Sequence, residues 1–100
     1  MVGRKRTREA KARVVWTDFA LRDLERIDDY IARDNPIAAE RWVQKLISAA
    51  ETVATAPLSG RTVPERQRDD IREVLLRHYR IVYRVRESRI DILTVFEGHK

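Results

Sequence analysis

The sequence predicts an α+β domain in which a hairpin of two helices packs on one face of a small, mainly antiparallel sheet. In residues 79–85 every second side chain is large and apolar, and two of the three between them are arginines, which is typical of a strand with one buried face. Residues 19–55 instead repeat apolar residues at three- and four-residue steps, which is typical of amphipathic helices. Short β-branched and aromatic runs flank both regions, so the expected order is strand, helix, helix, strand, strand, strand.

The composition narrows the class of protein. A length of 100 residues with 43% apolar residues fits one compact domain. The chain has no cysteine, which excludes disulfides, thiolate metal sites and cysteine nucleophiles, and its two histidines supply few ligands for zinc. No apolar run approaches the roughly 18 residues of a membrane span, and the basic start lacks the apolar region of a signal peptide. We therefore expect a cytoplasmic protein that uses no cofactor and no metal and does not enter a membrane.

Residues 1–12 are expected to form a basic, flexible N-terminal extension ahead of a single domain at residues 13–100. The segment holds almost no large apolar side chain that a core would bury. Together with Arg13 it carries six basic residues and one acidic residue, which equals the net charge of +5 of the whole chain. It is either an arm that binds nucleic acid or a solvated terminus, and the lack of a base-reading motif favours the second interpretation.

The first strand is predicted at residues 13–16 and the first helix at residues 19–33. Thr17 or Asp18 is a suitable N-cap for this helix, because a side-chain oxygen there accepts a hydrogen bond from the first turn. Apolar residues follow at helical spacing on one side, and charged residues occupy the rest of the helix surface. The predicted buried stripe consists of Ala20, Leu24, Ile27 and Ile31.

The second helix is predicted from Pro36 to about Thr55. Asn35 is the expected N-cap, and Pro36 fits the first helical position, where its missing N–H costs nothing. The short connection makes the two helices an antiparallel hairpin, and Pro57 ends the second one. Trp42 lies within the apolar stripe, so it is expected in the core rather than at a partner-binding surface. The other residues of the stripe are Ala39, Val43, Leu46, Ala50 and Val53.

Residues 56–70 are predicted to form a loop, because they contain two prolines, a glycine and a dense mixture of charges. A connection of this length exceeds what a compact fold requires, which favours a functional surface. Three strands follow at residues 71–77, 79–86 and 90–96, and the linker 87–89 is short enough for a hairpin. The strand at residues 79–86 is expected at the centre of the resulting sheet.

The common catalytic motifs are missing from the chain. It has no glycine-rich phosphate loop, no Gly-x-Ser-x-Gly turn and no His-Glu-x-x-His helix. What remains is a set of arginines on the predicted sheet. Such residues hold phosphate or carboxylate groups through paired hydrogen bonds, but they also keep an exposed strand soluble, and both interpretations stay open. These arginines are Arg72, Arg80, Arg84 and Arg86.

Several short segments share an order and spacing that point to a known family. They are Val15-Trp16-Thr17, Ala20 with Asp23-Leu24, Pro36 with Ala38-Ala39, Pro57, Gly60-Arg61, Arg72-Glu73, residues 79–85 and residues 92–95. This arrangement closely resembles the RelE/ParE superfamily of toxins from prokaryotic toxin–antitoxin pairs. The resemblance covers about residues 13–100 and implies the same β-α-α-β-β-β fold.

The resemblance also implies partners and a target. Toxins of this superfamily act in the cytoplasm and are neutralised by an antitoxin, whose C-terminal segment wraps the toxin and masks its toxic surface. Operator DNA is then contacted only indirectly, through the antitoxin complex. RelE-like members cleave mRNA in the ribosomal A site, whereas ParE-like members poison DNA gyrase by binding it. The resemblance implies no cofactor, and it leaves open whether this chain is an enzyme.

Individual positions favour the ParE-like branch. Arg72 matches the first basic residue of the RelE-like catalytic cluster, Arg80 matches the arginine of the central strand, and Lys100 falls near the basic residue after the final glycine, Gly98. Val74, however, occupies the place of a second catalytic lysine, and the sequence ends before any C-terminal tyrosine. These departures remove groups that a nuclease would use for proton transfer and base stacking.

We therefore expect a toxin that inhibits DNA gyrase by binding. The expected target-binding residues are Arg72, Arg80, Arg84 and Lys100. The alternative is a RelE-like, ribosome-dependent mRNA endonuclease, and a non-toxic orphan binding module is a third possibility. In the endonuclease the catalytic residues would be Arg72, Arg80, His99 and Lys100.

Overall fold

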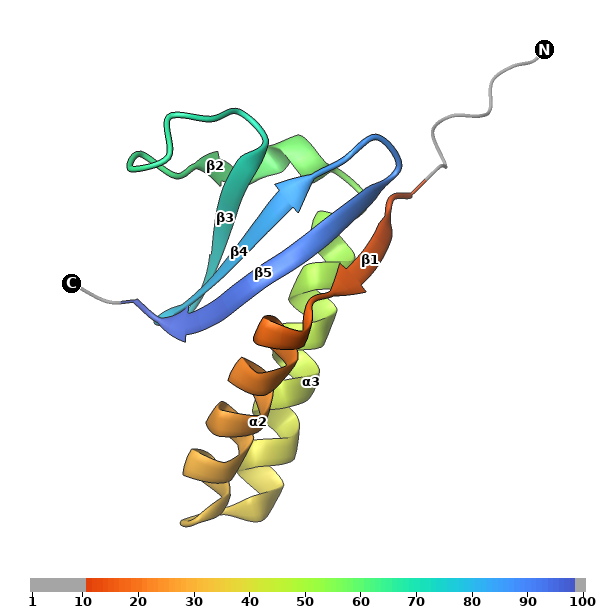
Figure 1. The fold of residues 1–100 in the computed structure, drawn as a ribbon. Coiled ribbons are helices and arrows are strands. Elements are labelled where there is room, and N and C mark those ends of the chain that lie inside the picture. Colours follow the sequence, from red (N-terminus) through yellow and green to blue (C-terminus); the bar gives the residue numbers. More distant parts are fainter. Residues whose placement is uncertain (1–10, 99–100) are drawn as a thin grey trace.

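The computed structural model describes residues 11–98 and confirms the predicted α+β fold (Figure 1). A helical hairpin lies on one side of a twisted sheet, and the order of the predicted helices and strands is the expected one. The elements are β1 (Arg13–Trp16), α2 (Asp18–Ala32), α3 (Pro36–Val53), a short 3-10 helix η2 (Pro57–Ser59), β2 (Arg61–Thr62), β3 (Ile71–Leu76), β4 (Tyr79–Val85) and β5 (Arg89–Glu97).

The five strands form one sheet in the order β1-β5-β4-β3-β2, so β4 is central as predicted. Neighbouring strands are antiparallel except β1, which runs parallel to β5 at one edge. At the opposite edge the structure differs from the prediction that residues 56–70 are entirely a loop. This stretch contains η2 and the two residues of β2, which pair with β3 and extend the sheet.

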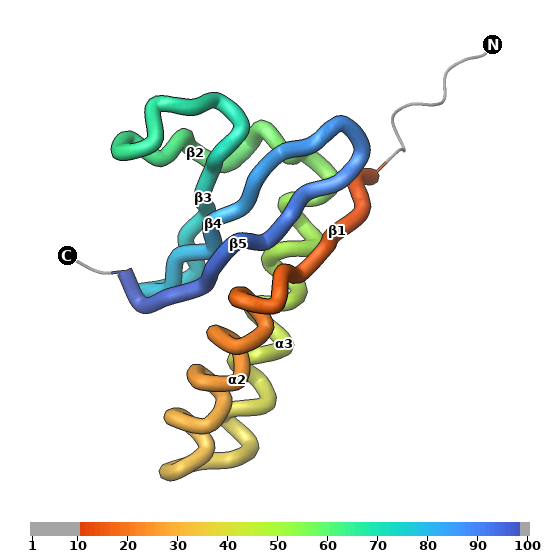
Figure 2. The backbone as a smooth tube through the Cα atoms, viewed as in Figure 1, coloured from red at the N-terminus to blue at the C-terminus, as the bar shows by residue number. Residues whose placement is uncertain are grey.

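The two helices begin at the predicted caps. Thr17 Oγ1 accepts a hydrogen bond from the Ala20 N–H (3.1 Å) and donates one to the Ile92 carbonyl (2.7 Å), so the same side chain caps α2 and ties it to β5. Asn35 Oδ1 accepts from the Ala38 N–H at 3.1 Å and caps α3. The helices then run side by side and antiparallel (Figure 2). Neither of them is long and apolar enough to cross a membrane.

The core lies between the helical hairpin and one face of the sheet. Tyr79, Ile81 and Tyr83 of β4 are buried there, as the alternation predicts. They pack with residues from the neighbouring strand β5 and from both helices, and burial of each large apolar side chain contributes about 1.5–3 kcal/mol to stability. Trp42 is half-buried against this core, with its ring 5.4 Å from that of Tyr79, which supports the core interpretation of this residue.

The first described residues, Lys11 and Ala12, already contact the end of the second helix. The Ala12 N–H donates to the Ala54 carbonyl at 3.0 Å, and Lys11 Nζ lies 2.9 Å from Glu51 Oε1. Contacts with α3 thus begin two residues ahead of the expected domain start. Residues 1–10 lie outside the described part, so the predicted flexible extension stays a prediction.

Candidate functional site

The candidate site lies on the face of the sheet that points away from the helices, which we call the outer face. Because Tyr79, Ile81 and Tyr83 face the core, Arg80, Val82 and Arg84 must face outward. Strand register then assigns the neighbours of these residues on β3 and β5. Besides the three residues of β4, the outer face includes Ile71, Glu73, Leu75, Asp91, Thr94 and Phe96.

The first feature of the outer face is a buried carboxylate between two arginines. Glu73 is only 2% exposed. Arg80 Nη1 donates to both of its carboxylate oxygens, at 3.0 and 2.8 Å, and Arg61 Nε donates to Oε2 at 2.6 Å. Arg80 Nε donates in addition to the Gly98 carbonyl at 3.0 Å, so the Arg80 guanidinium is fixed from two sides.

A second arrangement of the same kind lies where the loop enters β3. Asp70 accepts two hydrogen bonds from Arg68, at 2.9 and 2.7 Å, and one from Arg84 Nε at 3.0 Å. The pKa of Asp70 is lowered from 3.8 to about 2, and the hydrogen bond from Arg68 is the largest cause. Desolvation opposes this shift, whereas the hydrogen bond from Arg84 lowers the pKa further. Asp70 thus fixes the Arg84 guanidinium as Glu73 fixes that of Arg80.

The third arrangement lies where the turn connects the end of β4 to the start of β5. Asp91 accepts from Arg86 Nε at 3.0 Å and from Arg89 Nε at 2.8 Å. Burial alone would raise the pKa of Asp91, but the hydrogen bonds from Arg89 and Arg86 outweigh it and hold the pKa below its ordinary value. Each of the three carboxylates therefore sits between two arginines, and each set of three side chains keeps a net charge of +1.

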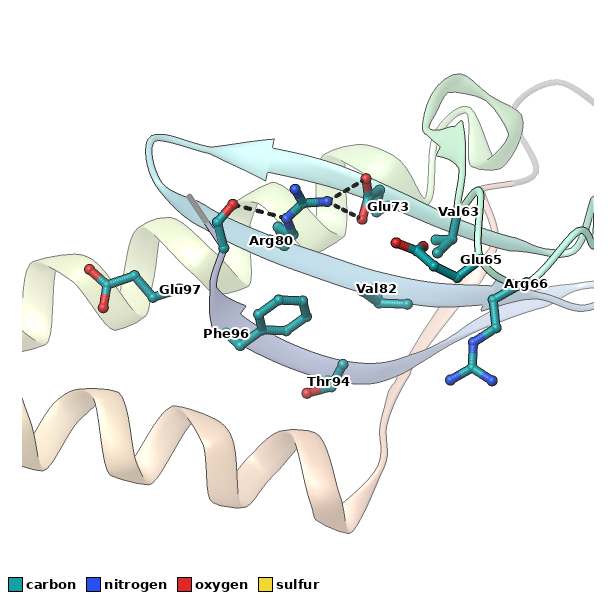
Figure 3. Close-up of a pocket in the computed structure, with 10 residues that line it drawn as sticks. Val63, Glu65, Arg66, Glu73, Arg80, Val82, Thr94, Phe96 and Glu97 are labelled. Atoms are coloured by element: carbon teal, nitrogen blue, oxygen red, sulfur yellow. Dashed lines mark hydrogen bonds and ion pairs between the residues drawn. The ribbon is translucent and has the colours of Figure 1, made fainter. Parts of the chain in front are cut away.

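The outer face is hollowed next to Arg80. The hollow has a volume of about 610 Å³, and the segment 63–66 forms one of its walls. Figure 3 shows the Arg80 guanidinium between Glu73 and the Gly98 carbonyl, with Phe96 on the neighbouring strand. Phe96 is 43% exposed, so a positive charge and an apolar ring line the same hollow. The full lining is Val63, Glu65, Arg66, Glu73, Arg80, Val82, Thr94, Phe96, Glu97 and Gly98.

The lining of this hollow carries two arginines and three glutamates beside its apolar side chains, so the hollow suits a protein segment that presents charged groups of both signs together with an apolar side chain. Guanidinium groups bind carboxylates and phosphates through paired hydrogen bonds, and here they are already held in place. Within residues 11–98, no three His, Cys, Asp or Glu side chains are grouped so that they would hold a metal ion.

Arg72 does not join Arg80 and Arg84 on the outer face, so these expected target-binding residues do not form one surface. A two-residue turn joins β3 to β4, so Arg72 lies opposite Tyr83 and on the core side of the sheet. Its Nε donates to the Asp69 carbonyl at 2.9 Å, and its Nη1 donates to the Leu58 and Gly60 carbonyls at 3.2 and 2.9 Å. Arg72 therefore holds the loop between α3 and β3 against the sheet.

Tyr83 holds the same loop through its hydroxyl group. Its hydroxyl donates to the Pro57 carbonyl at 2.6 Å and accepts from the Gly60 N–H at 3.1 Å, and its ring is fully buried. A Cβ at position 60 would collide with this hydroxyl and with the backbone of Glu73, so only glycine allows the close approach. Burial also raises the pKa of Tyr83.

Of the remaining predicted site residues, the structure describes three arginines and does not describe His99 and Lys100. Arg80 and Arg84 share the outer face, and Arg86 lies beyond the end of β4 with Asp91. His99 and Lys100 lie outside the described residues, so their roles stay predictions. The three carboxylates that position the arginines were not predicted from sequence, whereas the wall formed by residues 63–66 belongs to the loop 56–70, whose length had favoured a functional surface. Glu73 lies opposite Val82, and the sequence predicts this pairing only when the length of the turn between β3 and β4 is known.

Comparison with known proteins connects this fold to toxin–antitoxin systems. Residues 14–100 match the family model of the ParE toxin of the type II toxin–antitoxin system parDE. The putative toxin Y4kP of Sinorhizobium fredii is 39% identical over 93 residues, which cover 91% of this chain and 93% of that protein. The toxin RelE2 of Caulobacter vibrioides is 37% identical over 84 residues, which cover 84% and 92%.

A solved structure shares the same fold. A chain of the chromosomal ParDE system from P. aeruginosa superimposes with a TM-score of 0.74, and the match covers 90% of this chain and 99% of that one. The two sequences are 22% identical, so this comparison supports the architecture of sheet and helical hairpin.

Proposed function

Because this chain belongs to the family of ParE toxins of type II toxin–antitoxin systems, we propose that it inhibits DNA gyrase by binding it and that a cognate antitoxin neutralises it. The proposed action takes place in the cytoplasm and involves no covalent chemistry by this protein. The proposed contact surface is the hollow on the outer face, around Arg80 and Phe96.

The observation that carries this proposal is the fixed arrangement of the arginines. Arg80 and Arg84 are each held by a carboxylate, which suits a preorganised binding surface. Arginine stays protonated at any physiological pH and is therefore a poor general base. Arg72 and Tyr83, which would otherwise be candidates for chemistry, hold the loop against the sheet.

Supercoiling by purified gyrase in the presence of this protein tests the proposal. Arg66 is an exposed residue of the hollow, and Arg66→Glu reverses its charge; we expect inhibition to weaken by roughly tenfold or more, as for a binding residue worth about 1.4 kcal/mol. Arg22→Glu makes the same change on the exposed surface of α2 and is expected to leave inhibition unchanged. Equal effects of the two variants would remove the hollow from the proposal.

The similarity to the toxin RelE2 supports a second candidate function. A RelE-like endonuclease would cleave mRNA on the ribosome, and Arg80 together with His99 and Lys100 would supply its catalytic groups. Cleavage in phase with codons, lost on Arg80→Ala or His99→Ala, would favour this function. A chain that affects neither gyrase nor mRNA would instead be an orphan binding module.

We further propose that the antitoxin covers a second hollow, between α2 and the end of β5. This hollow has a volume of about 260 Å³ and combines apolar side chains with charges of both signs. Tyr30 is 70% exposed at its rim, and burial of such a ring is a frequent source of binding energy. If the adjacent gene product and this protein elute separately at micromolar concentration after co-expression, the antitoxin proposal is wrong.

A further inference from the structure

The two helices leave a groove between them on the side that faces away from the sheet, and we call it the hairpin groove. It has a volume of about 370 Å³, and its described lining residues all belong to α2 and α3. Leu24 and Val43 supply its apolar floor. The sheet packs on the other side of the hairpin, where Asp23 accepts a hydrogen bond from the Val95 N–H at 2.9 Å. The lining of the groove is Leu24, Glu25, Asp28, Glu40, Val43 and Gln44.

The rim of the hairpin groove is acidic on both helices. Glu25 and Asp28 lie three residues apart on α2, so they point to the same side of that helix, and Glu40 lines the groove from α3. Among the residues that the structure describes, no basic side chain lines the groove. Within residues 11–98 the three carboxylates also form no salt bridge, so their charge is available to a partner.

The basic residues of the two helices do not offset this rim. α2 carries five acidic and two basic residues and α3 carries two of each, so the helices together have a net charge of −3. Arg26 of α2 pairs with the buried Asp23. Lys45 of α3 lies 5.0 Å from the ring centroid of Trp42, which packs against the core. The remaining basic residues of the helices are exposed and outside the lining, namely Arg22 and Arg41.

Exposed apolar side chains extend the groove toward both ends. Leu21 lies one turn before Glu25 on α2 and is 45% exposed, and Ile37 lies one turn before Glu40 on α3 and is 66% exposed. Because the chain reverses direction at residues 33–35, Leu21 and Ile37 differ by about ten residues in level along the hairpin, or about 15 Å. Two apolar side chains therefore bracket an acidic groove that has an apolar floor.

We propose that the hairpin groove binds a basic amphipathic helix of another protein. A helix laid in a groove uses apolar anchors at helical spacing, and anchors at i, i+4, i+7 and i+11 span the distance from Leu21 to Ile37. Lysine or arginine residues beside these anchors would meet the carboxylates on both rims of the groove. The groove thus selects a partner by charge and by apolar periodicity together.

Other occupants match the groove less well. A second copy of this chain in a two-fold symmetric contact would place one acidic rim against the other, which is unfavourable. The groove shares no lining residue with the hollow around Arg80 or with the hollow proposed for the antitoxin. The inference therefore does not depend on which target the toxin has.

Fluorescence anisotropy with the full chain and a labelled synthetic peptide tests the proposal. The peptide is a helix of about 14 residues with Leu at the four anchor positions and Lys on both flanks. Glu25→Gln with Asp28→Asn removes two rim charges and is expected to weaken binding by about fivefold, as for two exposed ion pairs. Leu21→Ser with Ile37→Ser removes the exposed anchors and is expected to weaken it by about tenfold. Circular dichroism verifies that each variant is folded.

Two further variants separate the groove from general attraction between charges. Asp69→Asn with Glu87→Gln removes two exposed acidic charges next to the sheet and is expected to leave peptide binding unchanged. The triple variant Glu25→Lys, Asp28→Lys and Glu40→Lys reverses the rim. It is expected to lose the lysine peptide and to bind instead a peptide with Glu in place of each Lys.

Several results would overturn the proposal. One is a lack of saturable binding at about 1 mM peptide in low salt. Equal losses in the sheet control, equal binding of a scrambled peptide of the same composition, or displacement of the peptide by an equal charge of spermine would show only attraction between charges. A dimer of the free chain that dissociates in Leu21→Ser with Ile37→Ser, followed by analytical ultracentrifugation, would identify a second copy as the occupant instead.

Discussion

The buried hydroxyl of Tyr83 is one of the groups that tie the loop bordering the candidate site to the sheet, and Tyr83→Phe removes it. The phenylalanine ring fills the same space, so no cavity forms and no charge changes. What is lost are two hydrogen bonds, from the hydroxyl to the Pro57 carbonyl at 2.6 Å and from the Gly60 N–H to the hydroxyl at 3.1 Å. Gly60 is itself buried, so its N–H would be left without a partner.

The expected cost follows from that unpaired group. A buried donor or acceptor that loses its partner costs about 1–3 kcal/mol. In a domain of this size each kcal/mol lowers the melting temperature by roughly 4–8 °C. A central value of about 2 kcal/mol thus predicts that Tyr83→Phe melts about 8–16 °C below the parent protein.

Thermal and urea unfolding, followed by circular dichroism, measure this loss. Tyr30→Phe is the matched control, because the Tyr30 side chain is 70% exposed and its hydroxyl reaches water. The control is expected to change the free energy of unfolding by less than about 0.5 kcal/mol. If Tyr83→Phe were as stable as this control, the Tyr83 hydroxyl would not be what anchors the loop.

Three other changes have defined outcomes. Arg77 has a φ of 59° in the turn between β3 and β4, so Arg77→Gly is expected to raise the free energy of unfolding by about 1 kcal/mol, whereas Arg66→Gly is expected to lower it. Arg72→Lys loses the fork that contacts three carbonyls and is expected to cost about 1–3 kcal/mol in urea unfolding, against less than 0.5 kcal/mol for Arg66→Lys. The folded-state pKa of Asp70 is depressed, from 3.8 to about 2, so its contribution to stability is present above pH 3.8 and is lost as the pH falls through about 2. Asp70→Asn should therefore flatten this part of a stability profile against pH, and an unchanged profile would contradict the assignment.

The elements with strong local signals were predictable from sequence. The alternation in β4 identified its buried face, and the caps at Thr17 and Asn35 follow from side-chain chemistry within one helical turn. The amphipathic stripes were equally local. Ala20 and Leu24 are buried, as are Leu46 and Ala50 on the second helix.

The parts that depend on distant pairing were not predictable. Nothing near Arg13 indicates that β1 lies parallel to β5, because that contact joins residues more than 70 positions apart. The face on which Arg72 lies depends on the length of the turn before β4, since one residue more would move it to the other side. The partners of the arginines were missed for the same reason: a carboxylate such as Glu73 meets Arg61 and Arg80 only after three strands have paired.

The proposal that this toxin acts by binding is tested most directly by two parallel readouts on the unmodified chain, produced without its antitoxin. One is supercoiling by purified gyrase, and the other is cleavage of mRNA on translating ribosomes. We predict that supercoiling is inhibited, that inhibition weakens in Arg66→Glu, and that mRNA remains intact. Cleavage in phase with codons that disappears in Arg80→Ala or His99→Ala, with supercoiling unaffected, would contradict the account and identify a ribosome-dependent endonuclease.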